Sequence, residues 1–333
     1  MPLRSQNEGM TVPSRLPIVQ APMAGGPSTP ELAAATNAAG GFGYVAAGYL
    51  TADALDDLLR RTRALTSAPI GVNLFVPGAR APDEAAIAEY ARSLSGDPRW
   101  DDDAYDAKLD RLARSGLHTV SFTFGGPTPE VVERLHDAGT QVAVTVTSRD
   151  EAEQAAGIGA DCLVVQGTEA GGHQGTFDPA APNTTRLADA LAAVKGVGLP
   201  MVAAGGVMTA ADAVAALEAG AQAVQIGTAL LCTPEAGTSA PYRRALLERA
   251  YDETVITRAF SGRWARGLAN RFAREHADAP AGYPEIHYLT RPLRAAGAAA
   301  GDADVPNLWA GTGWRAVVER PAADVIAAIA AGL

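Results

Sequence analysis

The residue of this sequence best suited to acid–base chemistry is His173. It lies in the stretch VVQGTEAGGHQGTF, after the apolar run 162–166 and directly after Gly171 and Gly172. An apolar run of this kind predicts a buried strand, and two glycines remove side-chain bulk beside the imidazole. A core histidine would not need such an approach, whereas a histidine facing a flat ligand would. Because histidine exchanges a proton near neutral pH, we interpret His173 as a candidate catalytic base.

Two further glycine turns follow apolar runs later in the chain. One run ends in AAGGV, with Gly205 and Gly206, and the next ends in QIGT, with Gly227 and Thr228. Glycine lets backbone N–H groups approach a ligand, and a following helix N-terminus favours an anion. The two turns therefore predict a phosphate site. On these residues alone, tight turns without a ligand are an equal alternative.

Amide side chains also occur at the ends of predicted strands. Asn73 lies in GVNLF, Gln166 ends one apolar run and Gln225 lies inside another. Amides carry both donors and acceptors, which suits the mixed edge of a flavin ring. A satisfied core amide is the alternative for each residue, but three at one end of a sheet favour a ligand. Met23, beside two glycines, either lies against a ring face or fills the core.

Eight short apolar runs, bounded by Gly or Pro, alternate with segments that carry helix start signals such as Thr29 before Pro30. This alternation predicts an α/β protein with a (β/α)8 TIM barrel. An open doubly wound sheet uses the same alternation. The strand count and the absence of G-x-G-x-x-G after the first run favour the barrel. The runs are 17–20, 42–46, 70–75, 119–124, 141–145, 162–166, 201–204 and 223–226.

Two long stretches interrupt the alternation. One contains the acidic GDPRWDDDAYD, whose run Asp101–Asp103 is expected to be a solvated face, and the other is rich in Arg, Pro and aromatic residues. Insertions after barrel strands lie at the face that carries active sites. We therefore expect both to be helical and to meet as a cap over the barrel mouth, with a last helix over 322–333 packing back on the barrel. The expected parts are a ligand-binding TIM barrel of residues 1–76, 113–233 and 309–333 and a helical substrate-covering domain of residues 77–112 and 234–308.

Composition narrows the classes of partner. The 333 residues are 47% hydrophobic and 19% charged, with a net charge of -10, which argues against nucleic acid or an anionic membrane as the main partner. No apolar run approaches a membrane span, and the N-terminus lacks the apolar region of a signal peptide. Cys162 and Cys232 lie in apolar surroundings, which indicates a reducing compartment. We expect a soluble, cytoplasmic monomer or homodimer.

No metal site is expected, because the sequence has no H-x-x-x-H, C-x-x-C or carboxylate cluster at the predicted barrel mouth. Among the other histidines, His118 and His136 are expected in solvated positions. His276 and His287 lie in the covering segment and are candidates for its inner surface.

Seven stretches together resemble the class I nitronate monooxygenases, formerly called 2-nitropropane dioxygenases. Members of this family are FMN-dependent and oxidise alkyl nitronates, including propionate 3-nitronate, with oxygen to carbonyl compounds and nitrite. Some also accept the neutral nitroalkane after proton abstraction. The stretches, which cover most of the barrel and part of the cap, are QAPMAGG (20–26), GVNLF, SFTFG (121–125), QGTEAGGHQG, AAGGV, QIGTALLCTPEA (225–236) and GRWARGLANRF (262–272).

The resemblance implies roles for single residues. His173 matches the catalytic histidine, which abstracts the α-proton of a nitroalkane or holds the nitronate. The implied partners are a small-molecule nitronate or nitroalkane and O2. The implied FMN contacts are Met23, Asn73, Gln166, Gly171, Gly172, Gly205, Gly206, Gln225, Ile226, Gly227 and Thr228.

The chain departs from the family pattern at positions expected to line the substrate cavity. Thr123 stands where some members have histidine, His287 where others have asparagine, and Thr312 where glutamine is frequent. These departures bear on the identity of the substrate rather than on the reaction type. Tyr283 and Tyr288 are expected either to reach the cavity or to pack the cap.

Two other functions fit parts of the pattern. An NAD(P)H-dependent FMN reductase, such as an enoyl-ACP reductase-like enzyme or an NADH:quinone reductase, shares the barrel and an EAGGH-like motif, but PMAGG at the first strand favours the monooxygenase. A flavin-binding protein without catalysis is the second, and the intact EAGGHQG favours an enzyme. Cap arginines such as Arg263, Arg266 and Arg271 are expected to make the mouth locally positive despite the acidic net charge.

Overall fold

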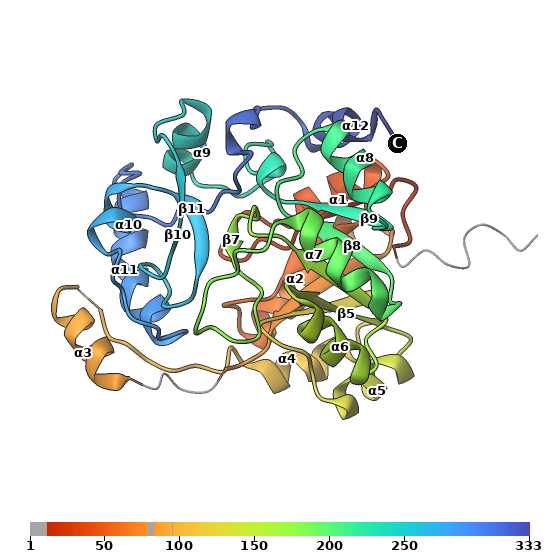
Figure 1. Ribbon diagram of the computed structural model, residues 1–333, viewed down its shortest axis with the longest axis horizontal. Helices are drawn as coiled ribbons and strands as arrows, with labels where there is room; N and C mark the ends of the chain where they lie inside the picture. Colours follow the sequence, from red (N-terminus) through yellow and green to blue (C-terminus); the bar gives the residue numbers. More distant parts are fainter. Residues whose placement is uncertain (1–11, 79–82, 95) are drawn as a thin grey trace, which may run out of the picture.

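The chain forms a closed parallel β-barrel surrounded by helices (Figure 1). The computed structural model describes residues 12–78, 83–94 and 96–333. Eight strands pair in parallel in the order β1-β9-β8-β6-β5-β4-β3-β2. A parallel bridge between Val19 and Phe42, with a 2.9 Å hydrogen bond from the Gln20 N–H to the Phe42 carbonyl oxygen, joins the two edges. This closure confirms the predicted (β/α)8 barrel and excludes the open doubly wound sheet.

Side chains along the barrel strands alternate between two environments. In β4, Val120 and Phe122 point outward into the core beneath the helices, whereas the small polar Ser121 between them points into the barrel. This alternation leaves polar side chains at the inner ends of several strands. The strands are β1 (Ile18–Gln20), β2 (Gly43–Ala46), β3 (Ile70–Phe75), β4 (Thr119–Thr123), β5 (Gln141–Val146), β6 (Cys162–Gln166), β8 (Met201–Ala204) and β9 (Ala223–Ile226).

The helices begin largely where the sequence signals predict. The Thr29 hydroxyl accepts a hydrogen bond from the Leu32 N–H at the start of α1, and the Ser148 hydroxyl accepts one from the Glu151 N–H at the start of α6. The helices are α1 (Pro30–Ala38), α2 (Ala52–Leu65), α3 (Glu84–Arg92), α4 (Tyr105–Leu112), α5 (Pro129–Asp137), α6 (Arg149–Gly157), α7 (Leu187–Val194), α8 (Ala210–Glu218), α9 (Ala240–Leu247), α10 (Arg271–Glu275), α11 (Glu285–Ala299) and α12 (Ala322–Ala330), with 3-10 turns η1 (Lys195–Val197), η2 (Thr228–Leu230) and η3 (Trp314–Ala316).

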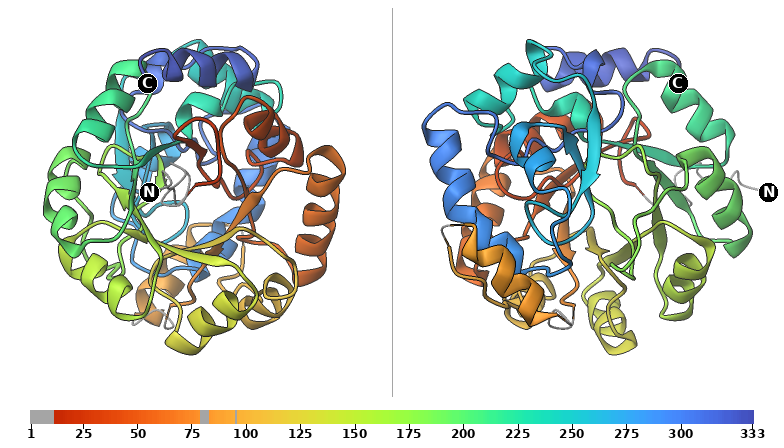
Figure 2. Two further views of the ribbon diagram at one scale, coloured as in Figure 1. Left: turned by 90° about the vertical axis from the view of Figure 1, so that its right-hand side faces the viewer. Right: turned by 60° about the vertical axis from the view of Figure 1, so that its left-hand side comes forward.

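The helices form a ring around the barrel axis, which the left view of Figure 2 shows. The C-terminal helix α12 packs against α1 and α8, as predicted. The outer core lies between strands and helices, and a second cluster inside the barrel includes Val19, Tyr44 and Cys162. Both cysteines are buried and free. Among the described residues, no helix is long and apolar enough to cross a membrane.

The segment 234–308 is not purely helical, which corrects the sequence-based expectation. It contains β10 (Thr254–Thr257) and β11 (Ala265–Leu268), which pair antiparallel. Strand β11 then pairs with β7 (Gly172–His173), a two-residue strand from the loop after β6. These strands are too short for a clear period-2 pattern, and the third member comes from a distant part of the chain. This small sheet ties the covering segment to the barrel (Figure 1).

The two inserted segments meet, as predicted. Helix α3 packs against α11, and the Tyr90 hydroxyl donates a 2.8 Å hydrogen bond to the Ala259 carbonyl oxygen. The right view of Figure 2 shows the orange α3 beside the blue α11. Helix α4 behaves differently, because it packs on α2 and contributes Leu109 and Leu112 to the outer barrel core. The barrel layer therefore begins before residue 113, the boundary expected from the sequence.

The acidic run before α4 is only partly solvated, which corrects a second expectation. Asp102 is exposed, but the side chain of Asp103 is 15% exposed. Its carboxylate lies 2.8 Å from the amine of Lys108, whose side chain is 0% exposed. A lysine is rarely buried to this degree without a charged partner. The run therefore contains one half of a buried ion pair.

Candidate active site

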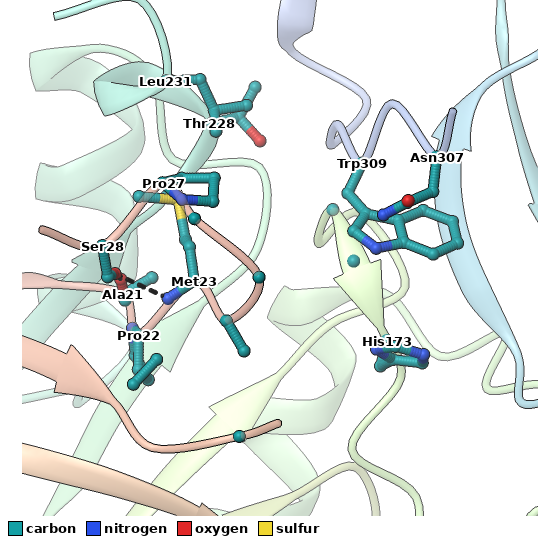
Figure 3. Close-up of a pocket in the computed structure, with 18 of the residues that line it drawn as sticks. Ala21, Pro22, Met23, Pro27, Ser28, His173, Thr228, Leu231, Asn307 and Trp309 are labelled. Atoms are coloured by element: carbon teal, nitrogen blue, oxygen red, sulfur yellow. Dashed lines mark hydrogen bonds between the residues drawn. The ribbon is translucent and has the colours of Figure 1, made fainter. Parts of the chain in front are cut away.

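A cavity of about 670 Å³ opens at the carboxyl ends of the barrel strands. This volume lies within the range of small-molecule sites. Figure 3 shows His173, Asn307 and Trp309 on one side of it and Met23, Pro27, Thr228 and Leu231 on the other. Inward-facing residues near the strand ends form its floor, which comprises Ala46, Asn73, Phe75, Thr123, Thr145, Gln166, Ala204 and Gln225.

The backbone around His173 is fixed from two directions. Its register partner in β11 is Ala265, and the Gln166 side chain donates a 3.1 Å hydrogen bond to the His173 carbonyl oxygen. The side-chain oxygen of Gln166 also accepts a 2.7 Å bond from the Gly175 N–H. Gln166, predicted only as a cofactor contact, therefore also anchors the loop that carries the candidate base. Its second amide hydrogen is left for a ligand.

The two glycines before His173 serve different purposes. A Cβ at Gly171 would lie 2.5 Å from the backbone nitrogen of Gly311, so this glycine allows close packing against the chain at Gly311. Gly172 has a φ of +78°, and a Cβ there would meet nothing within 4 Å. Because Gly172 lines the cavity, a side chain at this position would project into open space beside His173.

The His173 ring is held by one hydrogen bond and a shell of aromatic rings. Its Nε2 lies 2.8 Å from the Ser261 hydroxyl oxygen. The Ser261 oxygen also lies 3.3 Å from the Arg263 carbonyl oxygen, to which it can donate its single hydrogen. In that arrangement Nε2–H donates to Ser261, and Nδ1 keeps a lone pair for a substrate proton. The ring centroids of Phe124, Tyr283 and Trp309 lie 5.5 to 5.6 Å from that of His173.

The charge state of His173 follows from these surroundings. The pKa of His173 is lowered to about 3, mainly by burial of the ring and in smaller part by the positive charges of Arg263 and Arg294. Burial and like charge both disfavour the imidazolium ion. The imidazole is therefore neutral at physiological pH and has a lone pair with which to accept a proton.

The two guanidinium groups near His173 have no carboxylate partner among the described residues. Arg263 is 5% exposed and lies over the Phe124 ring at 3.9 Å. Arg294, from α11, donates to the Asn307 side-chain oxygen at 2.6 Å and to the His287 carbonyl oxygen at 3.0 Å. A buried guanidinium without a counter-ion favours an anionic ligand. The cavity is thus locally positive in a protein of net charge -10.

The other two cap arginines proposed from the sequence do not contribute to this charge. Arg266 donates to the Thr168 carbonyl oxygen and to the Thr254 hydroxyl oxygen. Arg271 pairs with Glu275 at 3.1 Å on the exposed surface. Neither residue lines the cavity.

The predicted glycine turns lie together on the barrel side of the cavity. Gly205 and Gly206 have φ values of +112° and +76°, a region that residues with a side chain rarely adopt. No hydrogen bond within the described part of the chain uses the backbone N–H of Gly206, Gly227 or Thr228. Adjacent unpaired N–H groups form a concave site for an anion. These turns are therefore suited to hold a phosphate.

The remaining predicted cofactor contacts fall into two groups. Met23, Asn73 and Gln225 line the cavity. The Asn73 amide nitrogen donates to Ser121 and Thr123, so its oxygen is the atom left for a ligand. Ile226 does not line the cavity, because its side chain points outward into the barrel–helix core.

Of the predicted substrate-lining residues, two line the cavity and two do not. Thr123 and His287 line the cavity. Tyr283 packs against His173 from behind and borders a narrow second pocket. Tyr288 lies at that second pocket as well, with the Arg99 guanidinium 4.1 Å from its ring centroid.

The other histidines lie away from the cavity. His136 is exposed beside Asp161, as expected, whereas His118 is half-buried against Phe42. His276 packs against Phe272 and does not reach the inner surface of the cover, contrary to expectation. Within the described residues, no group of three or more His, Cys, Asp or Glu side chains is arranged to hold a metal ion.

Several cavity residues were not identified from the sequence. Most come from the cover or from loops without a pair of glycines, so motif spacing gave no indication of them, whereas Phe75 is the last residue of β3. One signal was present in α11, where His287, Arg291 and Arg294 have the i, i+4, i+7 spacing of one helix face. All three line the cavity. The missed residues are Tyr49, Phe75, Ser261, Arg291, Arg294, Asn307 and Trp309.

These features define a (β/α)8-barrel enzyme with a covered, locally positive cavity at the carboxyl ends of its strands. The family model for nitronate monooxygenase matches residues 10–332. The chain is 39% identical to the nitronate monooxygenase of Paraburkholderia phytofirmans, over 93% of this chain and 90% of that one. It is 34% identical to a probable nitronate monooxygenase of Staphylococcus aureus strain JH9, over 94% and 93% of the two chains.

Solved structures give the same result. The fold is similar to that of nitroalkane oxidase from Streptomyces ansochromogenes, with a TM-score of 0.93, 47% identity and 96% coverage of both chains. It is less similar to FabK from Thermotoga maritima, with a TM-score of 0.76, 25% identity and coverage of 96% and 93%. The chain therefore belongs to the nitronate monooxygenase family and is an oxidoreductase, which confirms the resemblance seen in its motifs.

Proposed function

We propose that the protein is an FMN-dependent nitronate monooxygenase that oxidises alkyl nitronates, such as propionate 3-nitronate, with O2 to carbonyl compounds and nitrite. The observation that carries this proposal is the His173 ring, held by Ser261 in a cavity that is also lined by Arg294, a guanidinium group without a carboxylate partner among the described residues. A nitronate is a small anion, and such a cavity favours an anion over a neutral molecule. Family membership supports the same reaction class.

FMN fits the residues present on the barrel side. The unpaired N–H groups of Gly206, Gly227 and Thr228 would hold its phosphate. The Asn73 oxygen and the Gln225 amide would meet the mixed donor and acceptor edge of its ring. When bound, FMN would supply the electron transfer between substrate and oxygen, which no side chain of the cavity can supply.

The chain's own residues would then bind, orient and deprotonate the substrate. Arg294, which lines the cavity, would hold the negative charge of the nitronate near the ring of His173, and the charge of Arg263 would add to the positive potential there. With a neutral nitroalkane, Nδ1 of His173 would accept the α-proton, while Ser261 keeps Nε2 protonated. The aromatic shell of Phe124, Tyr283 and Trp309 would exclude water from that proton transfer.

The covering role of residues 234–308 is part of the same proposal. This segment supplies the cavity residues Ser261, His287 and Arg294 and closes over the cavity through α11. In the other inserted segment, α3 and Arg99 pack against α11, whereas α4 packs on α2 in the barrel layer. A substrate would therefore be enclosed mainly by α11 and the small sheet.

The test is an oxygen electrode run in parallel with absorbance at the NADH band. The FMN-loaded protein should consume oxygen and release nitrite when it meets propionate 3-nitronate or a simple alkyl nitronate, with no nucleotide present. NADH oxidation should be negligible with or without an enoyl thioester. Rapid NADH consumption without nitronate-dependent oxygen uptake would replace the proposal with the reductase reading. The absence of both activities would favour a flavin-binding protein without catalysis.

A further inference from the structure

The ion pair between Asp103 and Lys108 lies behind the substrate side of the cavity. The Lys108 amine is 2.8 Å from the Asp103 carboxylate and donates a 2.8 Å hydrogen bond to the Ala47 carbonyl oxygen. Burial raises the pKa of Asp103 to about 6 even beside the lysine. Replacing a buried ion pair by apolar residues often leaves stability unchanged or improves it. A buried ion pair of this kind is therefore weak evidence of a role in stability.

The same pair bridges two pieces of unusual backbone. Five non-glycine residues in the described part of the chain have a positive φ, and three of them surround this pair. They are Tyr49 at 68°, Asp103 at 58° and Ala104 at 50°. The second carboxylate oxygen of Asp103 accepts a 2.8 Å hydrogen bond from the Tyr49 N–H. Strained backbone persists only where its surroundings hold it, and it clusters at functional sites.

Tyr49, whose N–H donates to Asp103, reaches the cavity. The Tyr49 ring stacks on the His287 ring, with centroids 3.9 Å apart and planes 4° from parallel. The Tyr49 hydroxyl oxygen lies 3.4 Å from the Tyr283 hydroxyl oxygen. The centroid of the Tyr283 ring lies 5.6 Å from that of the His173 ring. Tyr49 and His287 both line the cavity. The left-handed backbone at Tyr49 thus directs its ring from the end of β2 against the cover.

We infer that Asp103 and Lys108 are positioning residues for substrate, which fix the backbone at Tyr49 and so keep its ring stacked on His287 as one wall of the cavity. The pair acts through Tyr49 and touches neither the substrate nor the phosphate turns. This inference rests on the proposed function in one respect, namely that the cavity wall at His287 faces a nitronate. The positioning itself is a matter of geometry and can be tested without turnover.

The first test is the structure and kinetics of Asp103→Asn, with Asp102→Asn as the matched control. The control removes one charge from the exposed neighbouring residue, whose carboxylate accepts a 3.0 Å hydrogen bond from the Ala104 N–H. In Asp103→Asn, we expect the Tyr49 ring to leave His287 in the crystal structure and KM for an alkyl nitronate to rise about tenfold, with kcat and FMN affinity nearly unchanged. Asp102→Asn should change none of these. A Tyr49 ring that stays stacked in Asp103→Asn would overturn the inference.

The second test is a double-mutant cycle with Tyr49→Ala. This variant leaves the ion pair intact and should raise KM by itself, which keeps the inference testable if Asp103→Asn does not fold. If Asp103 acts through Tyr49, adding Asp103→Asn to Tyr49→Ala should raise KM no further. Additive effects, or an unchanged KM in Tyr49→Ala, would contradict positioning. If the wild-type protein oxidises no nitronate, the proposed function fails, whereas the crystal structure of Asp103→Asn still decides the positioning.

Discussion

The barrel side and the cover side of the cavity present different kinds of chemical group. The barrel side consists of strand ends and glycine turns, and it offers backbone N–H groups at Gly206, Gly227 and Thr228. The cover side consists of large side chains, among them His287 and Arg294. Backbone groups recognise a phosphate without regard to side-chain identity, whereas charged and aromatic side chains determine which substrate fits. The difference indicates that cofactor retention and substrate selection are separable by mutation.

His173 lies between the two sides, because β7 comes from a barrel loop but pairs with β11 of the cover. We therefore expect substitution of His173 to have the largest effect on turnover. His173→Asn should lower kcat on a neutral nitroalkane about 100-fold or more, the usual contribution of a general base. FMN should stay bound, since the phosphate turns are untouched. Turnover of preformed nitronates should fall less, because they need no proton abstraction.

Steady-state kinetics on both substrate forms, together with the absorbance of bound flavin, measure this effect. His136→Asn is the matched control, because His136 is exposed beside Asp161 and far from the cavity. Equal losses on nitroalkane and nitronate would mean that His173 acts by binding rather than as a base. Loss of FMN would mean that the two sides are not separable.

Removing a cover charge tests substrate selection directly. Arg294→Met should raise KM for an alkyl nitronate about 10- to 100-fold, the scale of one charge-assisted hydrogen bond, with FMN affinity unchanged. The pKa of His173 should rise from its value of about 3, because one of the positive charges that lower it is gone. Histidine NMR titration measures the second effect. An unchanged KM would show that the anion does not bind near α11.

A methyl group at Gly172 tests whether the His173 loop contacts the cofactor. Gly172 and Gly139 have φ values of +78° and +73°, and a Cβ at either would meet nothing within 4 Å. Both alanine variants should therefore lose about 1 kcal/mol of stability from the same backbone strain. Only Gly172→Ala should weaken FMN or nitronate binding, roughly tenfold, because only this methyl enters the cavity. Thermal unfolding and flavin titration separate the two effects, and equal binding in both variants would contradict this placement.

Removal of the hydrogen bond between Ser261 and His173 is expected to have the smallest effect on turnover. Ser261→Ala should lower kcat on nitroalkane about threefold to tenfold, because Nε2 of His173 loses the partner that keeps it protonated. Ser261→Thr, which keeps the hydroxyl, should recover most of the rate. The loss should be absent with preformed nitronate. A loss that is equal for both substrate forms would assign Ser261 a packing role.

The sequence predicted one side of the cavity far better than the other. Strand runs and glycine turns are local signals, so all eight barrel strands and Gly205, Gly206, Gly227 and Thr228 could be placed from them. Even there, a shift of one residue reverses the direction of a side chain, and Ile226 points into the core rather than the cavity.

The structure of the covering segment, residues 234–308, could not be predicted in the same detail. Its sheet pairs β11 with a strand about ninety residues earlier, and such long-range pairing leaves no local pattern. Ser261 reaches His173 only through this long-range pairing. Asp103 was misjudged because a run of acidic residues usually lies in solvent, and its partner Lys108 is recognisable only once α4 is placed on the barrel.

The central claim is that this barrel holds an FMN that nitronates reduce without a nucleotide. Anaerobic mixing of the FMN-loaded protein with propionate 3-nitronate, followed through the flavin absorbance, tests it most directly. The account predicts rapid loss of flavin absorbance with the nitronate and none with NADH alone. Bleaching by NADH with no response to the nitronate would contradict it.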